Sequence, residues 1–367
     1  MRTLLLTPGP LTTTDEVRAA MNRDWGSRDE EFVTMSERVR ARLASLYGYE
    51  RSHVAVPVQG SGTFGVEAAL QTTVPRDAHL LVAINGAYGR RIVTIAERYG
   101  RRVSKIDVGD EAALDPAAIA HALANDPSIT DVAVVYVETT CGVLNPLAEI
   151  ASVVHRAGKR LFVDAMSGFG SLPLAGLQFT TLVASSNKGL ESAPGLAFAL
   201  IDRAHLERCE RNATSLALDL FAQWRGFERD GQWRFTPPVQ IVAALDKALD
   251  LLEREGGQAA RQKRYETNCA TLIAGLQQLG YASLLDPAIQ APIIVTVRAP
   301  TEAWYEFNLF YDTLGIEGVR IYPGKTTAAA SFRVGCIGAV DARDMQRAVD
   351  AIGRTTNRLR QSHAATA

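Results

Sequence analysis

Short apolar runs alternate with segments of helical periodicity from residue 53 to residue 201. The apolar runs contain few polar positions, so a strand formed by such a run must be covered on both faces. Buried strands that alternate with helices form a mostly parallel sheet between two layers of helices. The sequence therefore predicts an α/β fold. The predicted strands cover residues 53–58, 79–84, 103–108, 131–138, 160–165, 180–186 and 196–201.

The pattern changes after residue 240, where two long amphipathic helices replace the alternation. Gly256 and Gly257 stand between these helices and indicate a boundary. We therefore expect a large domain over residues 1–255 and a smaller α+β domain over residues 256–367, a division that the length of the chain permits. The elements predicted for the smaller domain are strands at 293–298, 319–323 and 331–335, a helix at 302–315, and a last helix from Asp341.

Charge and composition argue against several classes of function. The net charge is -1, with 47% hydrophobic and 22% charged residues and no block of one sign, so we expect neither nucleic-acid nor membrane-surface binding. The four cysteines lie far apart and the six histidines show no zinc-site spacing, so we expect free thiols and no metal. No apolar run approaches the ~18 residues of a membrane span, and the expected location is the cytoplasm.

The turn from Gly60 to Gly65 has the pattern G-x-G-x-x-G between a predicted strand and a predicted helix. Backbone N–H groups at such a helix start favour an anion, often a phosphate. In a dinucleotide site, an acidic residue follows about 20 positions later, at the end of the second strand. Asn85 and Gly86 stand there instead, which makes an NAD-dependent oxidoreductase the weaker interpretation. On this turn alone, a tight strand-to-helix turn with a capping hydroxyl remains an equal alternative.

Three further residues stand at or just after the carboxyl ends of predicted strands: Tyr88, Asp164 and Lys188. Ligands of such sheets bind beyond the carboxyl ends of the strands, so these side chains and the glycine-rich turn should converge. A phosphate cradle, an aromatic ring, a carboxylate and a lysine are the parts that hold pyridoxal phosphate (PLP). The lysine forms a Schiff base with the aldehyde, the carboxylate keeps the ring nitrogen protonated, and the aromatic side chain stacks on the ring. A lone lysine is usually a solvated surface charge, but this combination is far more specific.

Ten stretches in collinear order resemble the class V aminotransferases, which are fold-type I PLP enzymes. “GSGT”, “VDA” and “NK” mark the broad family. Three other stretches resemble the branch that transfers an amino group from 2-aminoethylphosphonate to pyruvate: “LALDLFAQW” (216–224), “WRFTPP” (233–238) and “IYPGK” (321–325). Gly168 and residues 189–192 depart from the family pattern, which concerns the shape of the pocket rather than the chemistry.

The resemblance implies roles for the residues that match. Lys188 would carry the Schiff base and shuttle the proton, Asp164 would pair with the pyridinium nitrogen, and Arg333 would bind the anionic group of the substrate. A lysine has an ordinary pKa near ~10.4, so the site must favour its neutral form, and the small uncharged neighbours of Lys188 fit partial desolvation. A guanidinium can bind either a phosphonate or a carboxylate in a bidentate manner.

The other implied residues surround the cofactor, and one of them would come from a second subunit. Thr236, with Trp233 or Arg234 near it, would reach the phosphate of the neighbouring subunit, which implies a homodimer with its sites at the interface. The implied cofactor-binding residues of the same subunit are Ser61, Gly62, Thr63, Tyr88, Asn187 and either Thr139 or Thr140.

The expected reaction converts 2-aminoethylphosphonate and pyruvate into phosphonoacetaldehyde and L-alanine. Alanine–glyoxylate or serine–pyruvate transamination would use the same core residues and stays open as an alternative. A PLP-fold protein without activity is disfavoured because Lys188 and Asp164 are both present. A phosphonate needs more donors than Arg333 alone. The candidates are the N–H groups after Pro8, the hydroxyls of Thr12 to Thr14, and Arg234.

Overall fold

The computed structural model describes residues 2–325 and 329–365. Its largest sheet has seven strands in the order β2-β10-β9-β8-β5-β3-β4. Only β10 runs antiparallel to its neighbours, so the predicted mostly parallel α/β sheet is confirmed. The strands are β2 (His53–Gln59), β3 (His79–Ile84), β4 (Arg102–Asp107), β5 (Asp131–Val135), β8 (Arg160–Asp164), β9 (Thr181–Ser185) and β10 (Leu196–Asp202).

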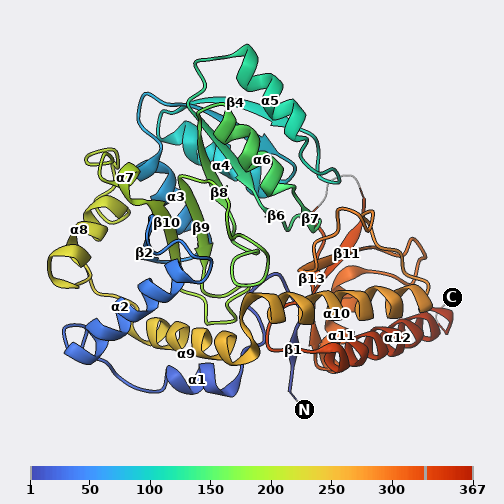
Figure 1. Ribbon diagram of the computed structural model, residues 1–367. Coiled ribbons are helices and arrows are strands. Elements are labelled where there is room, and N and C mark those ends of the chain that lie inside the picture. Colours follow the sequence, from blue (N-terminus) through green and yellow to red (C-terminus); the bar gives the residue numbers. More distant parts are fainter. Residues whose placement is uncertain (1, 326–328, 366–367) are drawn as a thin grey trace.

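Helices cover both faces of this sheet (Figure 1). Because successive strand residues point to opposite faces, Val132 and Val134 of β5 pack in one apolar cluster and Ala133 and Val135 in the other. The continuous apolar runs in the sequence are therefore explained. One cluster includes α2 (Glu30–Ser45), α5 (Pro116–Asn125), α6 (Leu147–Arg156) and α9 (Val239–Glu255), and the other includes α3 (Gly62–Thr73), α4 (Ala87–Arg98), α7 (Arg203–Leu206) and α8 (Leu220–Asp230).

A second, antiparallel sheet lies in the C-terminal part of the chain, with the order β11-β14-β13. It packs with three helices in a separate apolar cluster, seen at the orange and red end of Figure 1. Gly256 and Gly257 join α9 to α10 at φ values of 108° and 79°, where glycine avoids a steric cost. The elements are α10 (Gly257–Gln278), β11 (Ile294–Arg298), α11 (Phe307–Ile316), β13 (Tyr322–Pro323), β14 (Ser331–Gly335) and α12 (Ala342–Ala364).

The N-terminus joins this C-terminal cluster. β1 (Leu4–Leu5) pairs in parallel with β12 (Val319–Arg320), and Leu4 and Leu6 are completely buried there. The short α1 (Asp15–Ala20) then packs against α9. The division of the chain at residue 256 stays a prediction. The N-terminal strand β1 crosses that boundary, because it pairs with β12 in the C-terminal part.

Three predicted elements differ from the observed ones. The strand expected at 319–323 is divided into β12, which pairs with β1, and β13, which pairs with β14 in another sheet. The helix expected from residue 302 begins at Phe307, because the carboxylate of Glu306 accepts hydrogen bonds from the N–H groups of Asn308 (2.9 Å) and Leu309 (2.7 Å) and so caps it. The strand expected at 131–138 ends at Val135. Its last two residues form β6 (Val137–Glu138), which pairs with β7 (Val143–Leu144) outside the main sheet.

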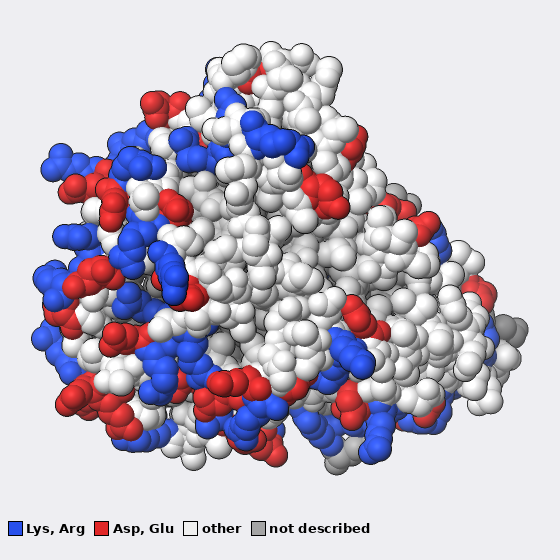
Figure 2. All heavy atoms as spheres, in the orientation of Figure 1, with Lys and Arg blue, Asp and Glu red and all other residues white. Residues whose placement is uncertain are grey.

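Charged residues show no single-sign area on the face drawn in Figure 2. Lys and Arg lie among Asp and Glu along the left and lower margins, and the central surface of that face is nearly free of both. None of the helices in residues 2–325 and 329–365 combines the length and the apolar character needed to cross a bilayer. Cys141, Cys209, Cys269 and Cys336 are buried and free.

Candidate active site

A cavity of about 470 Å³ lies beyond the carboxyl ends of β2, β5, β8 and β9. Its volume is that of a typical small-molecule site. The parallel strands bring together residues that are more than a hundred positions apart in the sequence. The predicted residues that line it are Ser61, Gly62, Thr63, Tyr88, Thr139, Asp164, Asn187 and Lys188.

Asp164 and Lys188 form the charged pair of the cavity. Asp164 ends β8, is almost completely buried, and accepts a hydrogen bond from the N–H of Met166 (3.0 Å). Burial raises the pKa of Asp164 to about 6. Burial also lowers the pKa of Lys188 to about 8, against the opposing effect of the Asp164 charge. At neutral pH both groups are therefore mainly charged, but each is close to its neutral form.

The N-terminal segment closes over Lys188. The Lys188 ammonium donates a hydrogen bond to the carbonyl of Pro8. A Cβ at Gly9 would lie 3.0 Å from Lys188 Nζ and 3.2 Å from Asn187 Nδ2, and Gly9 has a φ of 129°. Only glycine fits this position without strain, because it needs neither the space nor a negative φ. The backbone around residue 8 therefore accepts a hydrogen bond from the lysine, and the N–H of Gly9 donates to Thr7.

The glycine-rich turn has the geometry of an anion site. Ser61 is the N-cap of α3, yet its hydroxyl makes no capping hydrogen bond, and the first N–H groups of a helix have no partner within it. A Cβ at Gly62 would lie 2.6 Å from the sulfur of Met166, so a larger residue would displace the wall of the cavity. This part of the cavity fits a phosphate group.

Arg91 is a cavity residue that the sequence reasoning missed. Its Nη1 donates to the hydroxyl of Thr63 (2.9 Å), and its guanidinium lies 4.9 Å from the centre of the Tyr88 ring. It stands three positions after Tyr88 on α4, which is the spacing of side chains on one face of a helix. This spacing could have identified Arg91 from the sequence. The cavity therefore presents a cation beside its phosphate-binding turn.

Glu138 holds the backbone at Tyr88, and the sequence reasoning did not identify it. This completely buried carboxylate accepts hydrogen bonds from the N–H groups of Tyr88 (3.1 Å) and Gly89 (3.3 Å), and from the hydroxyl of Thr140 (2.6 Å). Burial raises the pKa of Glu138. The hydroxyl of Thr140 also accepts from the N–H of Ala87 (2.9 Å). Thr140 thus faces the start of α4, whereas its neighbour in the sequence lines the cavity.

Arg333 lies at the centre of β14 and is almost completely buried. Its Nη1 donates to the carbonyl of Thr139 (2.8 Å) and its Nε to the carbonyl of Pro323 (3.0 Å). Because Thr139 lines the cavity, the guanidinium lies beside it. Thr236 is exposed and does not line this cavity. Its predicted role toward a neighbouring subunit stays a prediction.

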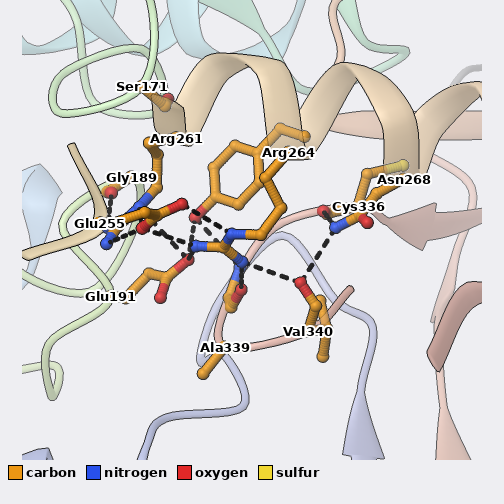
Figure 3. Close-up of polar contacts among 12 residues, drawn as sticks. Ser171, Gly189, Glu191, Glu255, Arg261, Arg264, Asn268, Cys336, Ala339 and Val340 are labelled. Atoms are coloured by element: carbon orange, nitrogen blue, oxygen red, sulfur yellow. Dashed lines mark hydrogen bonds and ion pairs between the residues drawn. The ribbon is translucent and has the colours of Figure 1, made fainter. Parts of the chain in front are cut away.

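Four buried or half-buried charged residues hold the loop after β9, and we name them the arginine–glutamate cluster (Arg261, Arg264, Glu191 and Glu255; Figure 3). Arg261 pairs with Glu255 (2.7 Å) and donates to the carbonyl of Gly189 (2.8 Å). Arg264 pairs with Glu191 (2.7 Å) and with Glu255 (2.8 Å). Two cations thus face two carboxylates, a balance that avoids the large cost of an unpaired buried charge.

The same cluster holds the segment that follows Arg333. Arg264 donates from Nη1 to the carbonyls of Gly338 (2.7 Å) and Val340 (2.8 Å), and Asn268 of α10 donates to the carbonyl of Cys336 (3.0 Å). The loop of Lys188 and the strand of Arg333 are therefore fixed to one helix. This connection positions the lysine amine relative to the guanidinium.

These features define a PLP-dependent aminotransferase, and the comparison with known families agrees. Residues 13–340 match the sequence model described as aminotransferase class-V, and the chain belongs to this family. The cofactor of the family is pyridoxal phosphate, and the cavity fits it with a phosphate-binding turn, an aromatic ring, a buried carboxylate and a lysine. The predicted family, fold class and cofactor are confirmed, and the dinucleotide interpretation gains no support.

Individual proteins are similar to this chain along nearly its whole length. The chain is 51% identical to 2-aminoethylphosphonate–pyruvate transaminase 2 of Burkholderia lata, over 96% of this chain and 94% of that protein. It is 49% identical to the 2-aminoethylphosphonate–pyruvate transaminase of Pseudomonas aeruginosa, over 97% of this chain and 96% of that protein. Among solved structures, pyridoxamine–pyruvate aminotransferase of Mesorhizobium loti has a TM-score of 0.89 at 26% identity, covering 98% of this chain and 93% of that chain.

Proposed function

We propose that this enzyme transfers the amino group of 2-aminoethylphosphonate to pyruvate and forms phosphonoacetaldehyde and L-alanine. The observation that carries the proposal is the Asp164–Lys188 pair behind a phosphate-binding turn, in a chain about half identical to transaminases named for this reaction. The aldehyde and the amino acid together contain all atoms of the two substrates, so no further reactant is needed.

The residues of the cavity have distinct tasks in this proposal. Ser61, Gly62 and Thr63 would hold the cofactor phosphate, Tyr88 would stack on the ring, and Asp164 would pair with the ring nitrogen. Bound pyridoxal phosphate would supply an electron sink for the carbon that loses its proton. Asn187 and Thr139 also line the cavity and would help to orient the ring.

Lys188 moves the proton. Its neutral amine can take a proton from the carbon that bears the donor nitrogen and return it elsewhere. The amine is partly desolvated and its pKa is lowered to about 8, so a useful fraction is neutral near physiological pH. Arg333 holds the anionic group of either substrate, which keeps the reacting carbon near Lys188 Nζ.

We expect kcat to rise as the pH increases through about 8 and to level off above it. An amine acts as a base only when neutral, and the pKa of Lys188 lies near this value because burial disfavours its charge. A pH profile of kcat with 2-aminoethylphosphonate measures the midpoint. A rising limb centred near ~10.4, the ordinary value for lysine, would show that Lys188 is not desolvated in the working enzyme.

A panel of substrates tests the proposed function directly. The enzyme should use 2-aminoethylphosphonate with pyruvate at a higher kcat/KM than alanine or serine with glyoxylate. The opposite order would refute the proposed donor and would leave the transaminase chemistry in place. Arg333→Lys should weaken the binding of both 2-aminoethylphosphonate and pyruvate, because an ammonium cannot replace the bidentate guanidinium.

The proposal includes a homodimer with its sites at the interface. Phe235, next to Thr236, is 50% exposed, and Leu216 is 73% exposed. Arg234 donates to the carbonyl of Leu216 (3.1 Å), which brings the two apolar side chains to one surface. Exposed aromatic and aliphatic side chains grouped in this way support an interface. Thr236 would then reach the cofactor phosphate of the partner.

Phe235→Asp should weaken the dimer by about tenfold or more, because it places a charge in an apolar contact. Cofactor affinity should fall with it, since each site would lose the Thr236 of its neighbour. Sedimentation velocity and cofactor dissociation measure the two effects. Leu309→Asp is the matched control, because Leu309 is also 50% exposed but lies on α11. An active monomer of the unmodified enzyme at working concentration would contradict the dimer.

A further inference from the structure

A phosphonate subsite needs more than Arg333. Two nitrogen atoms of the Arg333 guanidinium, Nη1 and Nε, already donate to the carbonyls of Thr139 and Pro323. A phosphonate has three oxygens and, like a phosphoryl group, carries more charge than a carboxylate. Its binding site should therefore contain a second cation that a carboxylate does not require.

The donors expected from the sequence make their contacts outside the cavity. The N–H of Gly9 donates to the hydroxyl of Thr7 (3.1 Å), and the hydroxyls of Thr12 and Thr14 accept from the N–H groups of Leu5 (2.8 Å) and Val17 (3.2 Å). Arg234 donates to the carbonyl of Leu216. None of these hydrogen bonds reaches a residue that lines the cavity, whereas Arg333 contacts Thr139 and Lys325 contacts Tyr88.

Lys325 is a cation beside the cavity. It follows β13, two positions after the carbonyl that accepts from Arg333, and its Nζ lies 5.3 Å from the centre of the Tyr88 ring. Tyr88 lines the cavity, so the ammonium lies within reach of it. In the described part of the chain, the lysines in ion pairs are Lys105 and Lys247. Lys325 thus keeps its charge available beside the site.

The lowered pKa of Lys188 agrees with this position of Lys325. Burial is its main cause, and the charges of Arg333 and Lys325 add to it against the opposing charge of Asp164. Repulsion between cations that face one site is offset when an anion binds there.

We propose that Lys325 and Arg333 together bind the phosphonate of the amino donor, and that Lys325 sets the preference for a phosphonate over a carboxylate. This inference rests on the proposed function. The ammonium of Lys325 faces the Tyr88 ring at 5.3 Å from its centre, a weak contact at an exposed site. A charge-assisted hydrogen bond to a dianion is stronger, so substrate binding draws the ammonium away from the ring.

Lys325→Gln should raise KM for 2-aminoethylphosphonate about tenfold or more and change KM for pyruvate by less than about threefold, because one charged hydrogen bond is lost only to the phosphonate. Lys325→Arg should restore most of the affinity. Lys159→Gln is the matched control, since Lys159 is half-buried at the opposite end of the sheet and donates to the carbonyl of Pro127 (2.9 Å). Equal changes for both substrates, or no change, would overturn the proposal.

Inhibition by two molecules without an amino group separates this inference from the proposed function. Ethylphosphonate and propionate differ in the anionic group, and neither can react. The unmodified holoenzyme should bind ethylphosphonate more tightly, and Lys325→Gln should remove most of that preference. If 2-aminoethylphosphonate proves a poor donor but this preference and its loss are observed, the proposed function fails and the role of Lys325 stands. If ethylphosphonate and propionate inhibit equally, the role of Lys325 is wrong.

Discussion

Lys188→Ala should reduce transamination by about 10⁴-fold or more and leave pyridoxal phosphate bound without a covalent link. The change removes both the amine that binds the cofactor and the base, and a positioned base alone contributes about 10²–10⁴-fold. Lys188 lines the cavity, whereas the ammonium of Lys325 lies beside Tyr88 at its edge. Single-turnover rates measure the loss.

Borohydride reduction followed by peptide mapping gives an independent test. In the unmodified enzyme the cofactor should be found on Lys188, and in Lys188→Ala no peptide should carry it. Lys159→Ala is the control and should behave like the unmodified enzyme. An adduct on Lys105 or Lys159 would refute the assignment of the lysine.

Asp164→Asn should lower activity by about 10²–10³-fold, as expected when a charged group loses its place in a preorganised site. The amide can still accept from the N–H of Met166, so the local structure should persist. The stability of the cofactor-free protein should change in the opposite direction. The pKa of Asp164 is raised to about 6 in the folded state, so its charge opposes folding at pH values above that.

Removing this charge should stabilise the cofactor-free protein by up to about 3 kcal/mol at pH 8, and the gain should vanish as the pH falls below about 4. Thermal unfolding at both pH values measures the effect. Near-normal turnover of Asp164→Asn would contradict its role toward the ring nitrogen. A loss of stability at pH 8 would show that the carboxylate is paired more favourably than its surroundings indicate.

The main sheet could be predicted because each strand is apolar on both faces. That same property hides strand direction: Leu196–Asp202 has the apolar pattern of its neighbours but runs against them. β1 could not be predicted because two residues carry no periodicity, and its partner β12 lies more than 300 positions away.

The position of Asp164 and Lys188 could be predicted because Asp164 ends one strand and Lys188 follows the next, at one edge of the sheet. Glu138 and Lys325 could not, since their contacts with Tyr88 join segments that no local pattern relates. The choice between Thr139 and Thr140 depended on which of two adjacent side chains faces the cavity.

The arginine–glutamate cluster has a consequence for attempts to change the substrate preference of this enzyme. Exposed Lys325 can be exchanged alone, because its charge stays in contact with water. Glu191 cannot, because its loss would leave Arg261 and Arg264 with one carboxylate, Glu255, between them in the cluster. Libraries that vary residues of the cluster should therefore change an arginine and a carboxylate together, whereas Lys325 can be sampled alone.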